Sequence, residues 1–273
     1  MMDMEFLGKA VIVTGSSKGI GKAIALSFAK LGASVLIHGR DEMSLKSTQS
    51  ECRSFGHQDA KFPIVQGDIL NEETLNSIVD RAIDEFSRID VLVNNAGVPN
   101  KLVSLLNGTM DDVDFNINMN FKVPLRMTQL CYAELKKSQG NIVNISSTVA
   151  VRPTTAMPFY AIAKAAMNMF TRCGGLEFSP DNVRINTVAP DAVGTNVLLN
   201  TGVLSTEQEM KGFQFASAKA IPLRKLISEE DVAKAVVFLA STSSMQGECV
   251  LVDGGRSLLG TDPETMANAA KCN

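Results

Sequence analysis

The residues with the clearest chemistry are Tyr160 and Lys164, four positions apart, and Ser147, thirteen positions before the tyrosine. Residues four apart on a helix share a face, so the ammonium group and the phenol would lie close together. A free phenol has a pKa of about 10 and carries protons poorly near neutral pH, but a neighbouring positive charge lowers that pKa. We therefore expect Tyr160 to serve as the acid or base that a hydride transfer to a carbonyl requires.

A second chemical signal is the glycine-rich run Thr14–Gly21, which reads Thr-Gly-Ser-Ser-Lys-Gly-Ile-Gly. It follows the apolar run Ala10–Val13 and leads into a helical pattern that Gly32 ends. Glycines let the backbone turn tightly and approach a pyrophosphate, whose charge then faces the N-terminus of the helix. The spacing is a variant, G-x-x-x-G-x-G, and in this strand–turn–helix context it predicts a dinucleotide-binding loop.

Strand and helix patterns alternate along the whole chain, which predicts an α/β fold with a parallel sheet covered on both faces. No linker divides the pattern, so we expect one Rossmann-like, doubly wound domain over residues 1–273. The expected strands are Ala10–Val13, Ser34–His38, Lys61–Gln66, Asp90–Asn94, Asn141–Ser146, Val183–Val188 and Glu248–Val252. The first expected helix begins at Ile20 and ends before Gly32. The others are Glu42–Phe55, Asn71–Phe86, Asp112–Lys137, Pro158–Phe178 and Ser228–Ala240.

Composition excludes several classes of function. The net charge is −3 without blocks of like charge, so we expect no nucleic-acid partner. Because the chain has only two histidines, we expect neither a histidine-based triad nor a zinc site, and no metal. The five scattered cysteines indicate thiols in a reducing compartment, the N-terminal residues do not resemble a signal peptide, and no apolar run approaches about 20 residues. We therefore expect a cytoplasmic protein with no membrane span.

Several motifs in register resemble those of the short-chain dehydrogenase/reductase family, of the common carbonyl reductase-like type. The resemblance spans nearly the whole chain. It rests on Thr14–Gly21, Asn94-Asn95-Ala96-Gly97, Asn120, the group Ser147, Tyr160 and Lys164, and Asp253-Gly254-Gly255. It implies an enzyme that interconverts a ketone and a secondary alcohol.

The resemblance also implies roles for four catalytic residues. Tyr160 would exchange a proton with the substrate oxygen, and Ser147 would hydrogen-bond that oxygen. Lys164 would lower the pKa of Tyr160 and hold the nicotinamide ribose. Asn120 would fix a water that connects Lys164 to solvent. Ser146 is the alternative to Ser147, but the thirteen-residue gap to Tyr160 favours Ser147.

Cofactor choice depends on the end of the second strand, which reads His38-Gly39-Arg40-Asp41. Family members that prefer NAD usually carry Asp at the position of Gly39. Arg40, with Lys18 from the glycine loop, would bind the 2′-phosphate of NADP(H). Asp41 is the counter-argument, because a register shift of two positions would bring in a carboxylate. We expect NADP(H) as the cofactor.

The remaining cofactor contacts follow from the resemblance. Asp68 and Ile69 would contact the adenine, and the segment from Pro190 would line the nicotinamide. Family members usually have Gly where this chain has Asp191, which would touch substrate, disfavour anionic substrates or face solvent. The full expected cofactor set is Gly15, Ser17, Lys18, Gly19, Ile20, Gly21, Arg40, Asp68, Ile69, Asn94, Ala96, Gly97, Tyr160, Lys164, Pro190, Val193 and Thr195.

The segment of about 191–226 is rich in apolar residues and corresponds to the family's substrate lid. It favours a bulky apolar carbonyl compound: steroid-like, terpenoid, 3-oxoacyl or xenobiotic. The family implies a homo-oligomer, a dimer or a tetramer, formed through the helices at about Asp112–Lys137 and Pro158–Phe178. The alternatives are a non-catalytic dinucleotide-binding scaffold, an NAD-preferring alcohol dehydrogenase of the same fold, and an epimerase or dehydratase with tightly held NAD.

Overall fold

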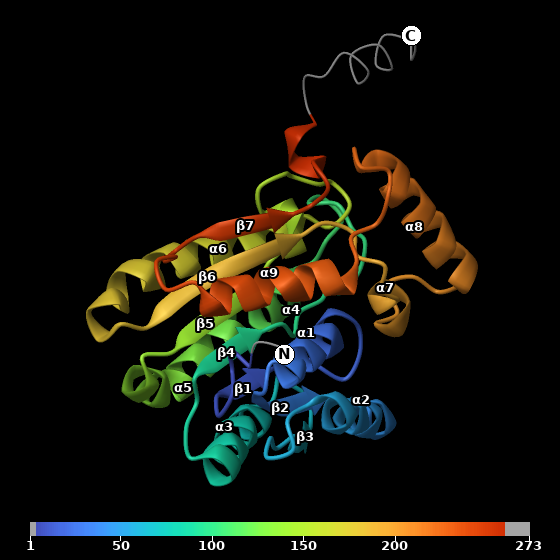
Figure 1. Ribbon diagram of the computed structural model, residues 1–273. Coiled ribbons are helices and arrows are strands. Elements are labelled where there is room, and N and C mark those ends of the chain that lie inside the picture. Colours follow the sequence, from blue (N-terminus) through green and yellow to red (C-terminus); the bar gives the residue numbers. More distant parts are fainter. Residues whose placement is uncertain (1–3, 260–273) are drawn as a thin grey trace, which may run out of the picture.

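Figure 1 shows the computed structural model, in which residues 4–259 are described. One sheet of seven parallel strands has the order β3-β2-β1-β4-β5-β6-β7. The chain builds outwards from β1 to β3, then returns to pair β4 with β1 and builds the other way. Ligands of such sheets bind beyond the carboxyl ends of the strands, where the order reverses. The strands are β1 Ala10–Val13, β2 Ser34–Gly39, β3 Ile64–Gln66, β4 Val91–Asn94, β5 Asn141–Ile145, β6 Arg184–Pro190 and β7 Cys249–Val252.

Helices cover both faces of the sheet. On one face of the sheet, the buried core contains residues of α1, α2 and α9. On the other face, it contains residues of α3 and α5, and α6 packs on β6. The helices are α1 Gly19–Lys30, α2 Glu42–Phe55, α3 Glu72–Phe86, α4 Met110–Ile117, α5 Val123–Ser138, α6 Pro158–Glu177, α7 Val197–Asn200, α8 Glu207–Ala220 and α9 Glu229–Ser241. Short turns are η1 Asn118–Lys122, η2 Thr148–Ala150, η3 Ser179–Asp181 and η4 Arg256–Leu258.

The central strands are short apolar runs because both of their faces are buried. In β5, Ile142 joins one core cluster, whereas Val143 and Ile145 join the other. Successive side chains of a strand point to opposite faces, so a strand between two helix layers needs apolar residues at nearly every position. This confirms the expected doubly wound fold.

The boundaries of the predicted elements agree with the structure to within three residues, apart from one long helix. α7 and α8 were not among the predicted helices, because they lie in the segment of about 191–226 that was expected as a lid. The stretch predicted as Asp112–Lys137 is divided into α4, the π-helical turn η1 and α5. Pro124 accounts for part of the break, because proline has no N–H to donate to the carbonyl of Asn120 one turn earlier. The resulting wide turn carries Asn120.

A buried carboxylate fastens the start of the sheet, far from the carboxyl ends of the strands. Asp90 is 5% exposed, and its oxygens accept bonds from Arg88 at 2.6 and 2.7 Å and from the Ala10 amide at 2.9 Å. The ammonium group of Lys9 lies 3.3 Å away. Removing the carboxylate would leave a cation and a buried amide without their acceptor.

We expect Asp90→Ala to lower the free energy of unfolding by about 3 kcal/mol. Urea denaturation would measure the change. Asp59→Ala is the matched control, because the Asp59 side chain is 81% exposed, and it should change the free energy by less than about 0.5 kcal/mol. Similar values for the two variants would contradict the assigned role of Asp90.

In the part of the chain from residue 4 to residue 259, none of the helices combines the length and the apolar character needed to cross a membrane.

Candidate active site

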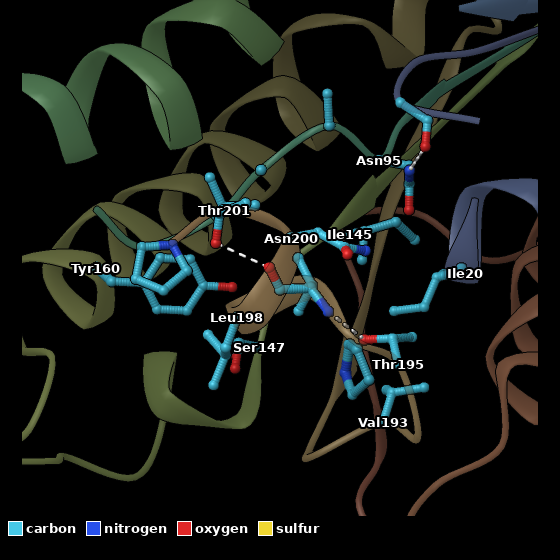
Figure 2. Close-up of a pocket in the computed structure, with 18 of the residues that line it drawn as sticks. Ile20, Asn95, Ile145, Ser147, Tyr160, Val193, Thr195, Leu198, Asn200 and Thr201 are labelled. Atoms are coloured by element: carbon cyan, nitrogen blue, oxygen red, sulfur yellow. Dashed lines mark hydrogen bonds between the residues drawn. The ribbon is translucent and has the colours of Figure 1, made fainter. Parts of the chain in front are cut away.

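A cleft of about 1550 Å³ lies along the carboxyl ends of the strands. Its walls come from the segments that follow β1 to β6, together with α7 and α8. Figure 2 shows Tyr160, Ser147 and Leu198 gathered at one end of the cleft, and Ile20, Val193 and Thr195 towards the other. The volume and length suit an extended ligand and a second small molecule together.

The turn between β1 and α1 has the shape that a pyrophosphate requires. Gly15 and Gly19 adopt φ values of +64° and +61°, which side chains disfavour. A Cβ atom on Gly21 would lie 2.3 Å from the carbonyl oxygen of Gly15, so position 21 tolerates no side chain. The backbone of the glycine turn at the N-terminus of α1 therefore borders the cleft, beside the side chains of Lys18 and Ile20, and these residues fit a dinucleotide phosphate.

Tyr160, Lys164 and Ser147 meet at the far end of the cleft. Tyr160 and Lys164 lie one turn apart near the start of α6, and the Lys164 Nζ lies 5.5 Å from the centroid of the tyrosine ring. Lys164 is 2% exposed, and its ammonium group donates a 2.8 Å bond to the Ile145 carbonyl at the end of β5. Ser147 follows the same strand and hydrogen-bonds with Tyr160.

The pKa values of this group differ from the sequence expectation. Burial raises the pKa of Tyr160, and the hydrogen bond with Ser147 lowers it again only in part. Burial also lowers the pKa of Lys164 to about 7. Lys164 is not among the groups that shift the pKa of Tyr160, which agrees with a lysine that is only partly charged near neutral pH.

This burial has a testable consequence for stability. The folded-state pKa of Lys164 lies below its ordinary value of 10.5, so the unfolded chain binds the extra proton between about pH 7 and pH 10.5. Stability of the native protein therefore rises with pH across this window. Lys164→Met should raise the free energy of unfolding by roughly 2–4 kcal/mol at pH 7, with a gain that shrinks towards pH 10. Urea unfolding at both pH values checks this, and a pH-independent gain would refute it.

Asn120 lies behind Tyr160 and Lys164 rather than on the cleft wall. A Cβ atom built on Gly97 would meet Asn120 Oδ1 at 2.8 Å and Lys164 Nζ at 2.9 Å, so both atoms face the same point. The Asn120 amide nitrogen donates to the carbonyls of Val98 and Asn116, at 2.9 and 3.1 Å. Its oxygen, although buried, has no hydrogen-bond partner among the described residues.

Sequence analysis missed a buried polar row on the same helix. Asn116 lies one turn before Asn120, and Asp112 lies a further turn back, and both are less than 5% exposed. Asn116 donates to Asn100 at 3.0 Å, and Asn100 donates to Asp112 at 2.6 Å. Lys101 closes the row at the surface, 2.9 Å from Asp112. The four-residue spacing of polar residues in a helical stretch was the available signal.

Nearly all of the residues expected to bind cofactor line the cleft. These are Gly15, Ser17, Lys18, Gly19, Ile20, Gly21, Arg40, Asp68, Ile69, Ala96, Gly97, Tyr160, Lys164, Pro190, Val193 and Thr195. Asn94 is the exception, because its side chain points into the fold and donates to Asn144 Oδ1 at 2.9 Å. Its neighbour Asn95 lines the cleft instead and holds the carbonyls of Thr14 and Gly15.

Asp191 lines the cleft without pointing to open solvent. Its Oδ1 accepts a 3.2 Å bond from the hydroxyl of Thr148, the residue after Ser147. Its Oδ2 lies 3.7 Å from the Arg256 guanidinium, which also donates to the Ala220 carbonyl at the end of α8. Burial raises the pKa of Asp191, and Arg256 opposes that shift. The carboxylate thus joins three segments around one end of the cleft.

Comparison with known proteins agrees with this geometry. The profile of a family described as enoyl-(acyl carrier protein) reductase matches residues 15–257. The chain is 34% identical to L-xylulose reductase of Caenorhabditis elegans, over 93% of this chain and 97% of that protein. A cofactor-bound short-chain dehydrogenase/reductase of unknown function from the same organism superposes with a TM-score of 0.88, at 32% identity over 94% of this chain and 97% of the other.

A further solved structure is 7α-hydroxysteroid dehydrogenase in complex with NADH and 7-oxoglycochenodeoxycholic acid. It has a TM-score of 0.82 and 30% identity, and the match covers 93% of this chain and 96% of that one. The motifs, the sheet order and these matches agree along nearly the full length. The chain therefore belongs to the short-chain dehydrogenase/reductase family, an oxidoreductase family whose members bind a nicotinamide dinucleotide.

Proposed function

We propose that this protein is an NADP(H)-dependent oxidoreductase that interconverts a ketone and a secondary alcohol, with Tyr160 as the acid or base. One observation carries the proposal: Tyr160, Ser147 and Lys164 line the same cleft as the glycine turn before α1. A reacting carbonyl and a dinucleotide can therefore share one cleft. Enzymes of this kind use the protein for geometry and electrostatics.

The bound cofactor supplies or accepts the hydride. Ser147 hydrogen-bonds the substrate oxygen and holds it while negative charge develops there. Tyr160 donates its hydroxyl proton to that oxygen in reduction and accepts it in oxidation. Lys164 binds the nicotinamide ribose, and in its charged form it stabilises the phenolate left on Tyr160.

Proton return to Tyr160 uses Lys164 and Asn120. Lys164 Nζ donates to Ile145, which leaves its other protons directed towards the space near Gly97. The unpaired oxygen of Asn120 faces that same space. A buried amide oxygen without a partner is costly. A water that donates to Asn120 Oδ1 and accepts from Lys164 Nζ would satisfy both groups and give a route for the proton.

The preference for NADP(H) rests on the end of β2. A Cβ atom on Gly39 would lie 2.7 Å from the Ser17 hydroxyl, so this position has no room for the acid that NAD-preferring members carry. Arg40 and Lys18 border the same part of the cleft with exposed side chains. Asp41 borders the cleft, caps α2 by accepting from the Ser44 amide at 2.8 Å, and lies 3.9 Å from the Lys18 ammonium group. The cap fixes this carboxylate at the start of α2, which weakens the register argument against NADP(H).

The substrate we propose is a bulky apolar carbonyl compound, covered by a lid of about residues 191–226. Apolar side chains from this segment line the cleft, among them Leu198, Met210 and Phe213. The 7-oxo steroid bound by the hydroxysteroid dehydrogenase supports a large ketone. Steroid-like, terpenoid, 3-oxoacyl and xenobiotic ketones are the classes to assay.

We also propose a cytoplasmic homo-oligomer, either a dimer or a tetramer. Ile162, Met169 and Leu176 recur every seven residues along α6 and are 52%, 55% and 83% exposed. A helix face of this kind suits close contact with a second copy of the chain. Cys52, Cys131, Cys173 and Cys249 are free thiols, as a reducing compartment favours. Light scattering would give the oligomeric state.

The test is NADPH consumption with a panel of ketones from the four classes, repeated with NADH. We expect turnover of at least one ketone, with a lower KM for NADPH than for NADH. A KM for NADH no higher than that for NADPH would contradict the cofactor assignment and favour an NAD-preferring alcohol dehydrogenase. A scaffold would bind NADPH and turn over none of the panel, and a protein purified with stoichiometric NAD would favour an epimerase or dehydratase.

A further inference from the structure

His38, the residue before the last of β2, is a buried histidine that the proposed mechanism does not use. It is 2% exposed and borders the cleft. Its Nδ1 lies 3.1 Å from the amide nitrogen of Gly15, and its Nε2 lies 3.3 Å from the carbonyl oxygen of Gly67. An amide N–H can only donate and a carbonyl can only accept. The ring is therefore neutral, with a bare Nδ1 and a proton on Nε2.

The two groups that this ring joins belong to separate loops on either side of β2. Gly15 opens the turn that follows β1, whereas Gly67 follows β3 and precedes Asp68. β2 lies between β1 and β3 in the sheet (Figure 1), so a side chain at its carboxyl end is well placed to contact both loops. The backbone of His38 adds two bonds to Ser16, at 2.7 and 3.0 Å.

We propose that His38 is a positioning residue for the cofactor, a neutral Nε2–H ring that locks the glycine turn to the loop after β3 and so sets the adenosine half of the cleft. The inference rests on the proposed function only in requiring that a dinucleotide binds there. A histidine that merely fills the core would need neither bond. Here both bonds satisfy backbone groups of loops that border the cleft.

The ionisation of the ring agrees with this role. Burial lowers the pKa of His38 to about 4, the nearby Asp68 and the bond to Gly67 oppose that shift, and Arg40 adds to it. A proton on Nδ1 would direct a second N–H at the N–H of Gly15 and break the bond that holds the turn. The ring thus keeps its bridging form at pH values well above 4.

The tautomer can be observed directly, because the chain contains only two histidines, His38 and His57. Protein with ¹⁵N-labelled histidine gives two ring patterns by NMR, and His57→Leu assigns them. We expect the His38 ring to remain a neutral Nε2–H tautomer from pH 8 to pH 5.5. Titration within this range, or an Nδ1–H tautomer, would overturn the proposal whether or not the protein turns over any ketone.

Binding of NADPH, followed by calorimetry, tests the positioning role. His38→Leu removes both bonds at similar volume and should weaken NADPH binding about tenfold or more, whereas kcat at saturating NADPH should fall less than threefold. His38→Asn retains an acceptor near the position of Nδ1 and should restore the affinity to within about threefold of the unmodified protein. His57→Leu is the matched control and should leave affinity and turnover unchanged.

The outcomes separate the explanations. Reduced thermal stability in His38→Leu with an unchanged Kd for NADPH would leave only a core role and overturn the proposal. If His38→Leu does not fold, the test uses His38→Asn and the tautomer of the unmodified protein. A Kd for NADPH that is more than tenfold higher in His38→Asn would show that the bond to Gly15 does not account for the cofactor affinity. A protein that binds neither NADPH nor NADH contradicts the proposed function instead.

Discussion

Replacement of Tyr160 by phenylalanine is expected to lower kcat/KM for any ketone substrate by roughly 10²–10⁴-fold, the usual contribution of a positioned acid or base. The ring itself would remain, so its packing and its contact with Lys164 at 5.5 Å are kept. Only the hydroxyl that hydrogen-bonds with Ser147 is lost. The Kd for NADPH should therefore change less than threefold. Single-substrate kinetics and calorimetric titration of the same preparation measure the two quantities.

The chain provides its own control, because Tyr132 is the only other tyrosine. Its hydroxyl donates to Asp181 at 2.9 Å, away from the cleft. Tyr132→Phe loses one hydroxyl in the same way and should leave kcat/KM within about twofold. Equal activity of Tyr160→Phe and the unmodified enzyme would identify the protein as a scaffold or assign the proton transfer to another group.

The fold was accessible from sequence because its signals are local. Apolar runs such as Val11–Val13 and Ile142–Ile145 are strands that are buried on both faces, and the helices end where glycine or polar residues interrupt the pattern. The π-helical turn η1 was not accessible. It depends on how Pro124 and Asn120 are placed relative to the loop after β4, and single-helix periodicity carries no trace of that contact.

Motif spacing identified Tyr160, Lys164 and Ser147 and most of the cleft wall, but not the side chains whose contacts depend on neighbouring elements. Asn94 and Asn95 are adjacent identical residues, and only the pleat of β4 and the turn after it decide which one faces the cleft. In the sequence, Asn116 does not differ from any other polar residue of a helix. Its role depends on its hydrogen bond to Asn100, which the fold brings beside it. The contacts of His38 with Gly15 and Gly67 exist only because β1 and β3 flank β2 in the sheet. Such roles arise from tertiary neighbours and leave no local pattern.

The double variant Lys18→Ala/Arg40→Ala is expected to reduce the preference for NADPH over NADH roughly hundredfold. Hydrogen bonds to a charged group each contribute about 1.5–3 kcal/mol. Because both side chains are exposed to solvent, we expect each bond to the 2′-phosphate to contribute near the lower end of that range, which together gives about a hundredfold. The loss should appear in the Kd and KM for NADPH, because NADH lacks the 2′-phosphate that these cations would bind. Its binding should change less than threefold.

Two outcomes of that experiment would contradict the assignment of Lys18 and Arg40. An equal loss of affinity for both dinucleotides would mean that the cations support the shared pyrophosphate or the fold of the turn. No loss for either would mean that they are solvated surface charges. The double variant Lys137→Ala/Arg81→Ala removes one lysine that pairs with Glu134 within α5 and one arginine that pairs with Glu85 within α3. Because it matches the change in net charge, it separates a local phosphate contact from a general effect of charge on the binding of an anionic cofactor.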